Sequence, residues 1–300
     1  MVIENKFPGK DVSEEDLLHK VPLAAKNNSD HRSIIKAGGV EFGGGLIPVF
    51  AGPNAVENEE MIVDTAKAVK AAGAHFLRAG AFKPLSFPYR STKFFELREE
   101  GLRYLATAKR EAGIPVITEI MHIDKIDAVA EVADIMQIGS RNMQNYPLLE
   151  EVAKCGKPIM LKRHFGCSLR DWLGAAEYIL YNGNPNVILC ERGVVTPHTH
   201  RPTSRFMLDL QVVPAAQEVT HLPIATDPSH ATFWRKWVGP MTLASIASGA
   251  DAIMLEVHPD PENSAIDPLH PINFKAFSDL MNSMEQVAQA IGRTVYSPSN

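Results

Sequence analysis

Short apolar runs recur along this chain, and each is followed by a longer stretch whose apolar residues have helical spacing. The runs lack the polar alternation of a strand with one wet face, so they are typical of strands buried on both faces. Eight such strands separated by helices predict an α/β fold with one closed (β/α)8 barrel, the TIM-barrel architecture, rather than an open sheet. The runs are residues 47–50, 75–77, 115–118, 134–138, 158–161, 186–189, 222–225 and 252–255.

The rest of the chain suits a single domain. A length of 300 residues with 45% hydrophobic composition fits one barrel better than two unrelated domains. We expect a polar arm over residues 1–32 and the barrel domain over residues 33–300, in which a hairpin around a Gly-Gly pair (33–45) caps the N-terminal face. The main helical patterns are residues 58–72, 93–112, 148–155, 169–180, 205–219 and 240–248.

Composition narrows the functional classes. No apolar run approaches the ~20 residues of a membrane span, and no signal peptide stands at the start. The net charge of −5 argues against nucleic acid, and the aromatic and basic run 233–237 is expected to pack or to contact another subunit rather than to bind bases. The three cysteines lack C-x-x-C spacing and predict reduced thiols in the cytoplasm.

Cationic residues follow several of the predicted strands. In a parallel barrel all the C-terminal strand ends surround one mouth, so these cations are expected to converge there. Within an acidic chain, such a cluster predicts a site for a small, highly anionic molecule carrying phosphate and carboxylate groups. The five cations are Arg78, Lys83, Arg141, Lys162 and Arg192.

Seven strand-end motifs, taken in order, resemble the type I-beta 3-deoxy-D-arabino-heptulosonate-7-phosphate (DAHP) synthases and, more distantly, 3-deoxy-D-manno-octulosonate-8-phosphate synthase. The resemblance extends from about residue 20 to about residue 284. Each motif is weak alone, but seven in the same order form a specific signal. The motifs are A-G-P-N (51–54), R-A-G-A-F-K-P (78–84), I-G-S-R-N-M-Q-N (138–145), L-K-R (161–163), C-E-R-G (190–193), D-P-S-H-A-T (227–232) and E-V-H-P (256–259).

The resemblance implies an aldol-like condensation of phosphoenolpyruvate with an aldose phosphate or a related aldehyde. Phosphate is released and a 3-deoxy-2-ketoaldonate is formed. It places Lys83 between the two substrates, and Glu119 is a candidate to orient or deprotonate the attacking water. Asn54 and His230 complete the expected catalytic set. The expected substrate-binding residues are Arg78, Lys83, Pro84, Ser86, Arg141, Lys162, Arg192 and Arg205.

The family's metal site is only partly matched. DAHP synthases use a divalent metal held by Cys, His, Glu and Asp, and here His230, Glu256 and Asp267 match three ligands. The fourth position is Asn54, and an amide is a poorer ligand than a thiolate. Metal-independent octulosonate-phosphate synthases carry Asn at this place. We therefore expect either no cofactor or a weakly bound Mn, Zn or Fe ion.

The acceptor side also departs from the family. The Arg-Thr pair that grips the phosphate of erythrose 4-phosphate is replaced by Leu85 and Ser86, and a leucine cannot pair with phosphate. Arg90 is the nearest candidate replacement. The family loop S-D-G-P-Q-S becomes I-D-P-L-H-P at residues 266–271. Two changes on this side, beside an intact phosphoenolpyruvate side, predict a changed acceptor.

Two alternatives to this function stay open at the level of sequence. One is a Schiff-base aldolase that uses Lys162 as its nucleophile. The other is a catalytically silent protein that binds phosphoenolpyruvate, a sugar phosphate or a partner. The resemblance also implies a homodimer or homotetramer.

Overall fold

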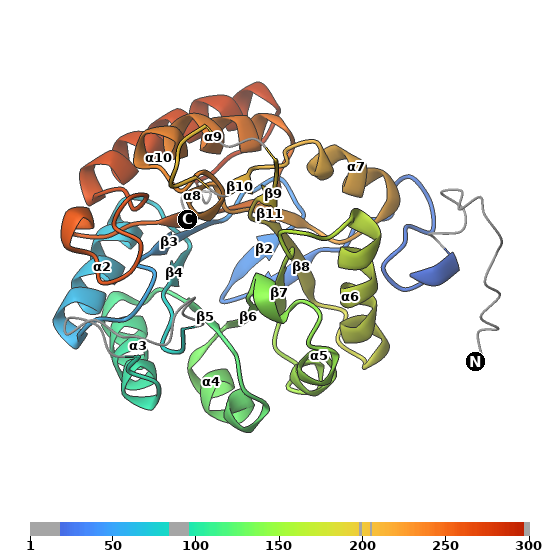
Figure 1. The fold of residues 1–300 in the computed structure, drawn as a ribbon, viewed down its shortest axis with the longest axis horizontal. Coiled ribbons are helices and arrows are strands. Elements are labelled where there is room, and N and C mark those ends of the chain that lie inside the picture. Colours follow the sequence, from blue (N-terminus) through green and yellow to red (C-terminus); the bar gives the residue numbers. More distant parts are fainter. Residues whose placement is uncertain (1–18, 84–95, 198–199, 205, 297–300) are drawn as a thin grey trace.

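Eight parallel strands form a closed barrel in this computed structural model, which describes residues 19–83, 96–197, 200–204 and 206–296 (Figure 1). The strands are β3 (Val49–Gly52), β4 (Phe76–Arg78), β5 (Val116–Glu119), β6 (Ile135–Ile138), β7 (Ile159–Lys162), β8 (Val187–Glu191), β11 (Ile224–Thr226) and β12 (Ala252–Glu256). Each pairs with the next along the chain, and β12 closes the ring against β3. The predicted barrel is confirmed, and every predicted run overlaps one of its strands.

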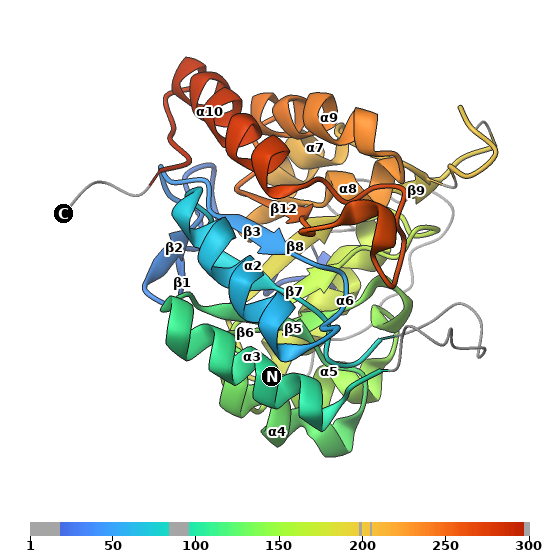
Figure 2. The ribbon, with the colours of Figure 1, turned by 90° about the vertical axis from the view of Figure 1, so that its left-hand side faces the viewer.

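Helices surround the strands on the outside (Figures 1 and 2). Local sequence explains where several begin: Asn58 accepts a hydrogen bond from the Met61 N–H at 2.9 Å, and Ser168 forms a reciprocal capping box with Asp171. The helices are α2 (Glu59–Ala71), α3 (Glu99–Ala112), α4 (Ile126–Val132), α5 (Tyr146–Ala153), α6 (Leu169–Tyr181), α7 (Val212–Val219), α8 (Pro228–Thr232), α9 (Arg235–Ala247) and α10 (Phe274–Ala290).

A short hairpin packs against one end of the barrel interior. Its strands are β1 (Ile35–Ala37) and β2 (Val40–Phe42), and the Phe42 ring lies 5.5 Å from that of Phe50. Gly38 turns the hairpin at φ 53°, where a Cβ would lie 2.4 Å from the Pro115 side chain. Gly38 is therefore required both by backbone conformation and by contact with the barrel, whereas Gly39, at φ 80°, is required by backbone conformation alone.

One predicted helix begins much later than the sequence pattern indicates. The pattern over residues 205–219 predicted a single helix, but Phe206–Met207 form strand β10, which pairs antiparallel with β9 (Val194–Val195). The helix α7 starts only at Val212. The prediction was wrong because strand pairing with a distant segment overrode the local helical spacing.

The segment before the hairpin is held by hydrogen bonds to the barrel's helices. The N–H groups of Leu23 and Ala24 both donate to the Glu177 carboxylate at 2.9 Å, and Lys26 N–H donates to Val219 O at 2.9 Å. Among the described residues, no helix is both long and apolar enough to cross a bilayer.

The buried His75, immediately before β4, should make stability depend on pH. Its Nδ1 accepts the Val49 N–H at 3.2 Å, and burial lowers its pKa from 6.5 to about 4. Between these two pH values unfolded His75 binds a proton while folded His75 does not. The contribution of the neutral ring to the free energy of unfolding is therefore complete above pH 6.5 and is lost as the pH falls towards 4. We expect His75→Gln to reduce the slope of unfolding free energy in this window by up to about 1.4 kcal/mol per pH unit. Equal slopes in denaturant titrations of the two proteins would contradict this.

Candidate active site

Five cationic side chains lie at the C-terminal mouth of the barrel, close enough to perturb one another. Burial lowers the pKa of Lys83, and the charges of Arg78 and Lys162 lower it further. Burial also lowers the pKa of Arg192, and the charge of Arg141 acts in the same direction. Mutual repulsion of this kind is offset when a multiply charged anion binds, so the mouth is suited to such a ligand.

The Arg192 guanidinium is poised for an anion. Its carbon lies 4.5 Å from the centre of the Phe206 ring, within the range of a cation–π contact. Its Nη1 is buried and makes no hydrogen bond to any described residue. A buried charged donor without a partner is costly, and a bound phosphate or carboxylate would remove that cost.

Lys162, Asp227 and His230 form a buried chain of charge and hydrogen bonds. Lys162 Nζ lies 2.5 Å from Asp227 Oδ2, and His230 Nδ1 lies 3.1 Å from Asp227 Oδ1. Because a carboxylate only accepts, Nδ1 carries the proton and the lone pair of Nε2 is available. Burial by itself disfavours the Asp227 carboxylate, but His230 and Lys162 hold its pKa well below the usual range. Burial lowers the pKa of His230 to about 3, so the ring is neutral at pH 7.

Glu256, the last residue of β12, is the centre of a second cluster. Its Oε2 lies 2.8 Å from His270 Nε2, and 3.6 Å from both His230 Nε2 and Arg78 Nη1. Burial by itself would raise the pKa of Glu256, but His270, His230 and Arg78 together lower it to about 2. The carboxylate is therefore charged throughout the physiological range.

Asn54 lies beside Asp267 across the same part of the mouth. Its Nδ2 donates to Asp267 Oδ2 at 3.1 Å, and this leaves the amide oxygen Oδ1 buried with no hydrogen-bond donor among the described residues. Glu256 Oε1 is likewise buried without a donor. Orphaned acceptor oxygens beside the lone pair of a neutral imidazole are what a divalent cation requires, so the residues fit such an ion.

Glu119 ends β5 with one oxygen bound and the other unpaired. Gln137 Nε2 donates to Oε2 at 3.3 Å, while Oε1 is buried and has no partner within the described part of the chain. A Cβ on Gly139 would lie 2.0 Å from Oε1. The glycine of the I-G-S-R motif thus provides the space into which this carboxylate points.

Some of the predicted substrate-binding residues lie outside the described residues. These are Pro84, Ser86 and Arg205, together with Leu85 and Arg90 on the acceptor side. Their assignment continues to rest on the sequence resemblance alone.

Comparison with known proteins identifies the family. The model of the DAHP synthetase I family matches residues 23–293. This chain belongs to the DAHP synthetase I family. The phospho-2-dehydro-3-deoxyheptonate aldolase of Thermotoga maritima is 39% identical over 293 residues, covering 97% of this chain and 85% of that protein. The 2-dehydro-3-deoxyphosphooctonate aldolase of Methylococcus capsulatus is 27% identical and covers 81% of this chain and 91% of its own length.

Solved structures agree with the family assignment. The crystal structure of the Thermotoga maritima DAHP synthase superposes with a TM-score of 0.84 at 39% identity, covering 91% of this chain and 78% of that one. A truncated form of the same organism's enzyme gives a TM-score of 0.83 at 38% identity, covering 92% of this chain and 99% of that one.

Two site residues of this family member were missed by the sequence analysis. Asp227 was noted only as part of a motif, although its place three residues before His230 is a signal, since it caps α8 and binds the imidazole. His270 was noted only as a departure from the family loop. The structure buries it completely and places it against Glu256, which its distance in sequence could not indicate.

The Arg163 side chain, next to Lys162, has a structural role. It donates to Glu191 at 3.0 Å and Asp209 at 2.8 Å, and to the Cys167 carbonyl oxygen. Successive residues at a strand end point in opposite directions, so Lys162 lies in the mouth while Arg163 ties the loops together outside it.

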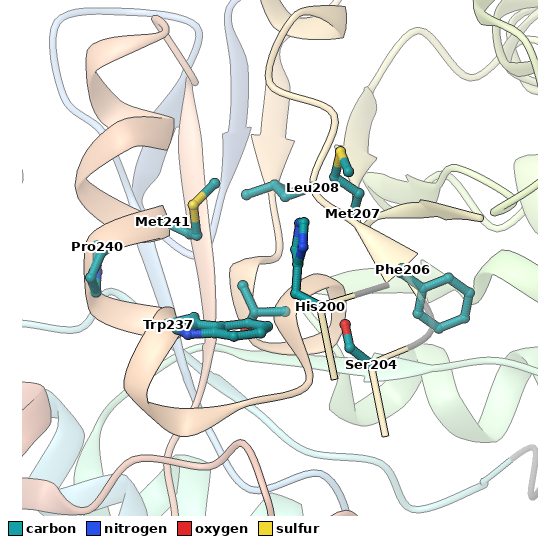
Figure 3. Close-up of a pocket in the computed structure, with 9 residues that line it drawn as sticks. His200, Ser204, Phe206, Met207, Leu208, Trp237, Pro240 and Met241 are labelled. Carbon is teal, nitrogen blue, oxygen red and sulfur yellow. The ribbon is translucent and has the colours of Figure 1, made fainter. Parts of the chain in front are cut away.

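A separate apolar cavity of about 240 Å³ lies beside the mouth, between the chain around β10 and helix α9 (Figure 3). Trp237 and His200 meet there with ring centres 6.2 Å apart, and the neighbouring Arg201 lies 3.4 Å above the Trp234 ring. The aromatic run 233–237 therefore packs within the molecule, as predicted. The lining residues are His200, Ser204, Phe206, Met207, Leu208, Thr232, Trp237, Pro240 and Met241.

Proposed function

We propose that this protein joins phosphoenolpyruvate to an aldose phosphate or a related aldehyde, releasing phosphate and forming a 3-deoxy-2-ketoaldonate. The observation that carries the proposal is the convergence of five cations at the barrel mouth, with Arg192 Nη1 buried and unpaired among the described residues. Family membership gives the reaction class, since the relatives named above are aldolases of 3-deoxy-2-keto sugar phosphates.

In the proposed reaction, C3 of phosphoenolpyruvate forms a bond to the aldehyde carbon while water adds to C2. The bond from C2 to the phosphate oxygen then breaks, and the departing phosphate takes the proton of the C2 hydroxyl as the 2-keto group forms. Arg78, Arg141, Lys162 and Arg192 bind the carboxylate and phosphate of phosphoenolpyruvate. Lys83, whose pKa burial lowers, donates a proton to the aldehyde oxygen, and Glu119 accepts one from the attacking water.

His230, Glu256 and Asp267, with Asn54 Oδ1, are the residues that would hold a divalent cation. A cation bound there supplies a Lewis acid for the aldehyde oxygen. Asp227 fixes the His230 tautomer that leaves Nε2 available, and burial keeps that imidazole neutral.

The structure disfavours the Schiff-base alternative. An amine that attacks a carbonyl must present a lone pair, but Lys162 Nζ is engaged in a buried ion pair with Asp227.

The alternative of a catalytically silent binding protein is tested by measuring activity. We expect phosphate release from phosphoenolpyruvate with at least one member of a panel of aldoses and aldose phosphates. Binding of phosphoenolpyruvate without release with any of them would favour the silent protein.

Erythrose 4-phosphate should be a poor acceptor. Leu85 replaces a phosphate-binding arginine, and a lost contact of this kind costs about 2–5 kcal/mol. Restoring arginine with Leu85→Arg and threonine with Ser86→Thr should raise kcat/KM for erythrose 4-phosphate at least about tenfold. Leu23→Arg, at an exposed leucine outside the mouth, is the matched control. Efficient turnover of erythrose 4-phosphate by the unaltered protein would refute the expectation.

The remaining assignments rest on the resemblance. We propose residues 1–32 as an arm, residues 33–300 as the catalytic domain, a homodimer or homotetramer as the assembly, and the cytoplasm as the compartment.

A further inference from the structure

We propose that His270 is a metal ligand of this protein, forming with His230 and Glu256 a thiolate-free site for a divalent cation such as Mn²⁺, Co²⁺ or Zn²⁺. The inference deepens the proposed function and rests on it. Its test measures cation binding without turnover, so the two can fail separately.

The donor atoms are spaced as the ligands of a single metal ion would be. His270 Nε2 and His230 Nε2 lie 2.8 and 3.6 Å from the same oxygen of Glu256. All three ligand atoms lie within 4.8 Å of one another. Metal bonds of about 2.1 Å in a tetrahedral site place neighbouring ligand atoms about 3.4 Å apart, so only small shifts would be needed.

The surroundings supply unused acceptors and a negative charge. Asn54 Oδ1 and Glu256 Oε1 are buried without donors within the described residues. The Glu256 carboxylate brings a negative charge to this space, and its Oε2 lies 2.8 Å from His270 Nε2. A cation in this space would satisfy oxygens that the folded chain leaves unpaired.

The sequence changes are complementary. The family motif places a thiolate where this chain has Asn54, and the family loop has glutamine where this chain has His270. One strong ligand is lost and one imidazole is gained, on two loops that meet through the hydrogen bond between Asn54 and Asp267. Imidazole is a good ligand for borderline divalent ions, whereas losing the thiolate removes the preference for soft ones.

The loop holds His270 rigidly in place. Arg235 donates through Nε to Pro271 O at 2.6 Å and through Nη2 to Pro268 O at 2.8 Å, which ties the backbone on both sides of the histidine. The Phe233 ring lies 4.9 Å from the imidazole. A ligand held in this way loses little conformational entropy when the ion binds.

A rival role for His270 predicts the opposite result. Without an ion, the 2.8 Å contact is a hydrogen bond from Nε2–H to Glu256. If the ring merely filled the place of a metal, replacing it by the family's glutamine would open the site and strengthen metal binding. If the ring is a ligand, the same substitution weakens binding.

The experiment is a titration of chelator-stripped protein with Co²⁺ and Mn²⁺, followed by calorimetry and, for Co²⁺, by visible absorption. We expect one ion per chain and a Co²⁺ spectrum without a thiolate charge-transfer band. His270→Gln should weaken binding at least about 10–100-fold, the loss seen even for residues that only support a ligand. His31→Gln is the matched control and should bind as the unaltered protein does, because His31 stacks on His221, which precedes β11 at the N-terminal end of the barrel.

A rescue variant distinguishes loss of a ligand from misfolding of His270→Gln. Asn54→Cys combined with His270→Gln restores the family's donor set, so it should regain affinity and acquire a thiolate-to-Co²⁺ band. The proposal is overturned if the unaltered protein binds no Co²⁺ at millimolar concentration. It is also overturned if His270→Gln alone, shown by thermal unfolding to be folded, binds as tightly as the unaltered protein or more tightly.

Discussion

Glu119→Gln is expected to lower kcat by about two to four orders of magnitude, the usual contribution of a positioned general base. The amide keeps the shape of the side chain and its contact with Gln137, but it cannot accept the proton of the attacking water. Binding of phosphoenolpyruvate, followed by thermal shift, should survive. Glu111→Gln, at an exposed glutamate paired with Lys67, is the control and should leave kcat unchanged. Unchanged turnover in Glu119→Gln would remove this residue from the reaction.

A second variant tests the same carboxylate without altering it. Gly139→Ala places a methyl carbon only 2.0 Å from Glu119 Oε1, which is too close for the two atoms to coexist. The carboxylate must therefore move, and kcat should fall. Gly174→Ala is its control, because a Cβ there meets nothing within 4 Å. Full activity in Gly139→Ala would show that the position of Oε1 does not matter.

Arg192→Ala is expected to abolish saturable binding of phosphoenolpyruvate at concentrations that stabilise the unaltered protein. Truncating one partner of a buried charged contact costs about 2–5 kcal/mol, or roughly 30-fold to several thousand-fold in affinity. The fold should persist, because Nη1 forms no hydrogen bond with the described residues.

Thermal shift measures this effect directly, since ligand stabilisation grows with the ratio of ligand concentration to Kd. Arg103→Ala, at an exposed arginine on α3, removes the same side chain from the surface and should keep the full shift. A normal shift in Arg192→Ala would separate this arginine from the anion site. If the unaltered protein shows no shift at millimolar phosphoenolpyruvate, the whole site assignment fails.

The sequence by itself determined the barrel and which cationic residues were assigned to its mouth. Strands buried on both faces must be apolar throughout, so the eight runs were visible without a structure. Seven of the strands end one or two residues beyond their runs, and β6 ends with its run at Ile138. In a parallel barrel every strand points the same way. Residues that follow the runs, such as Arg78 and Arg192, could therefore be assigned to one place from their position in sequence.

Only the tertiary structure decided which polar residues meet. Lys162 and Arg163 are adjacent and both cationic, yet one pairs with Asp227 in the mouth and the other with Glu191 and Asp209. Phe206–Met207 became a strand because β9 lies alongside. His270 reached Glu256 through a loop whose path is set by Arg235. The local spacing of apolar residues indicates whether a segment is a helix or a strand. Contacts between loops depend on how distant parts of the chain pack in three dimensions, and local spacing carries no information about that packing.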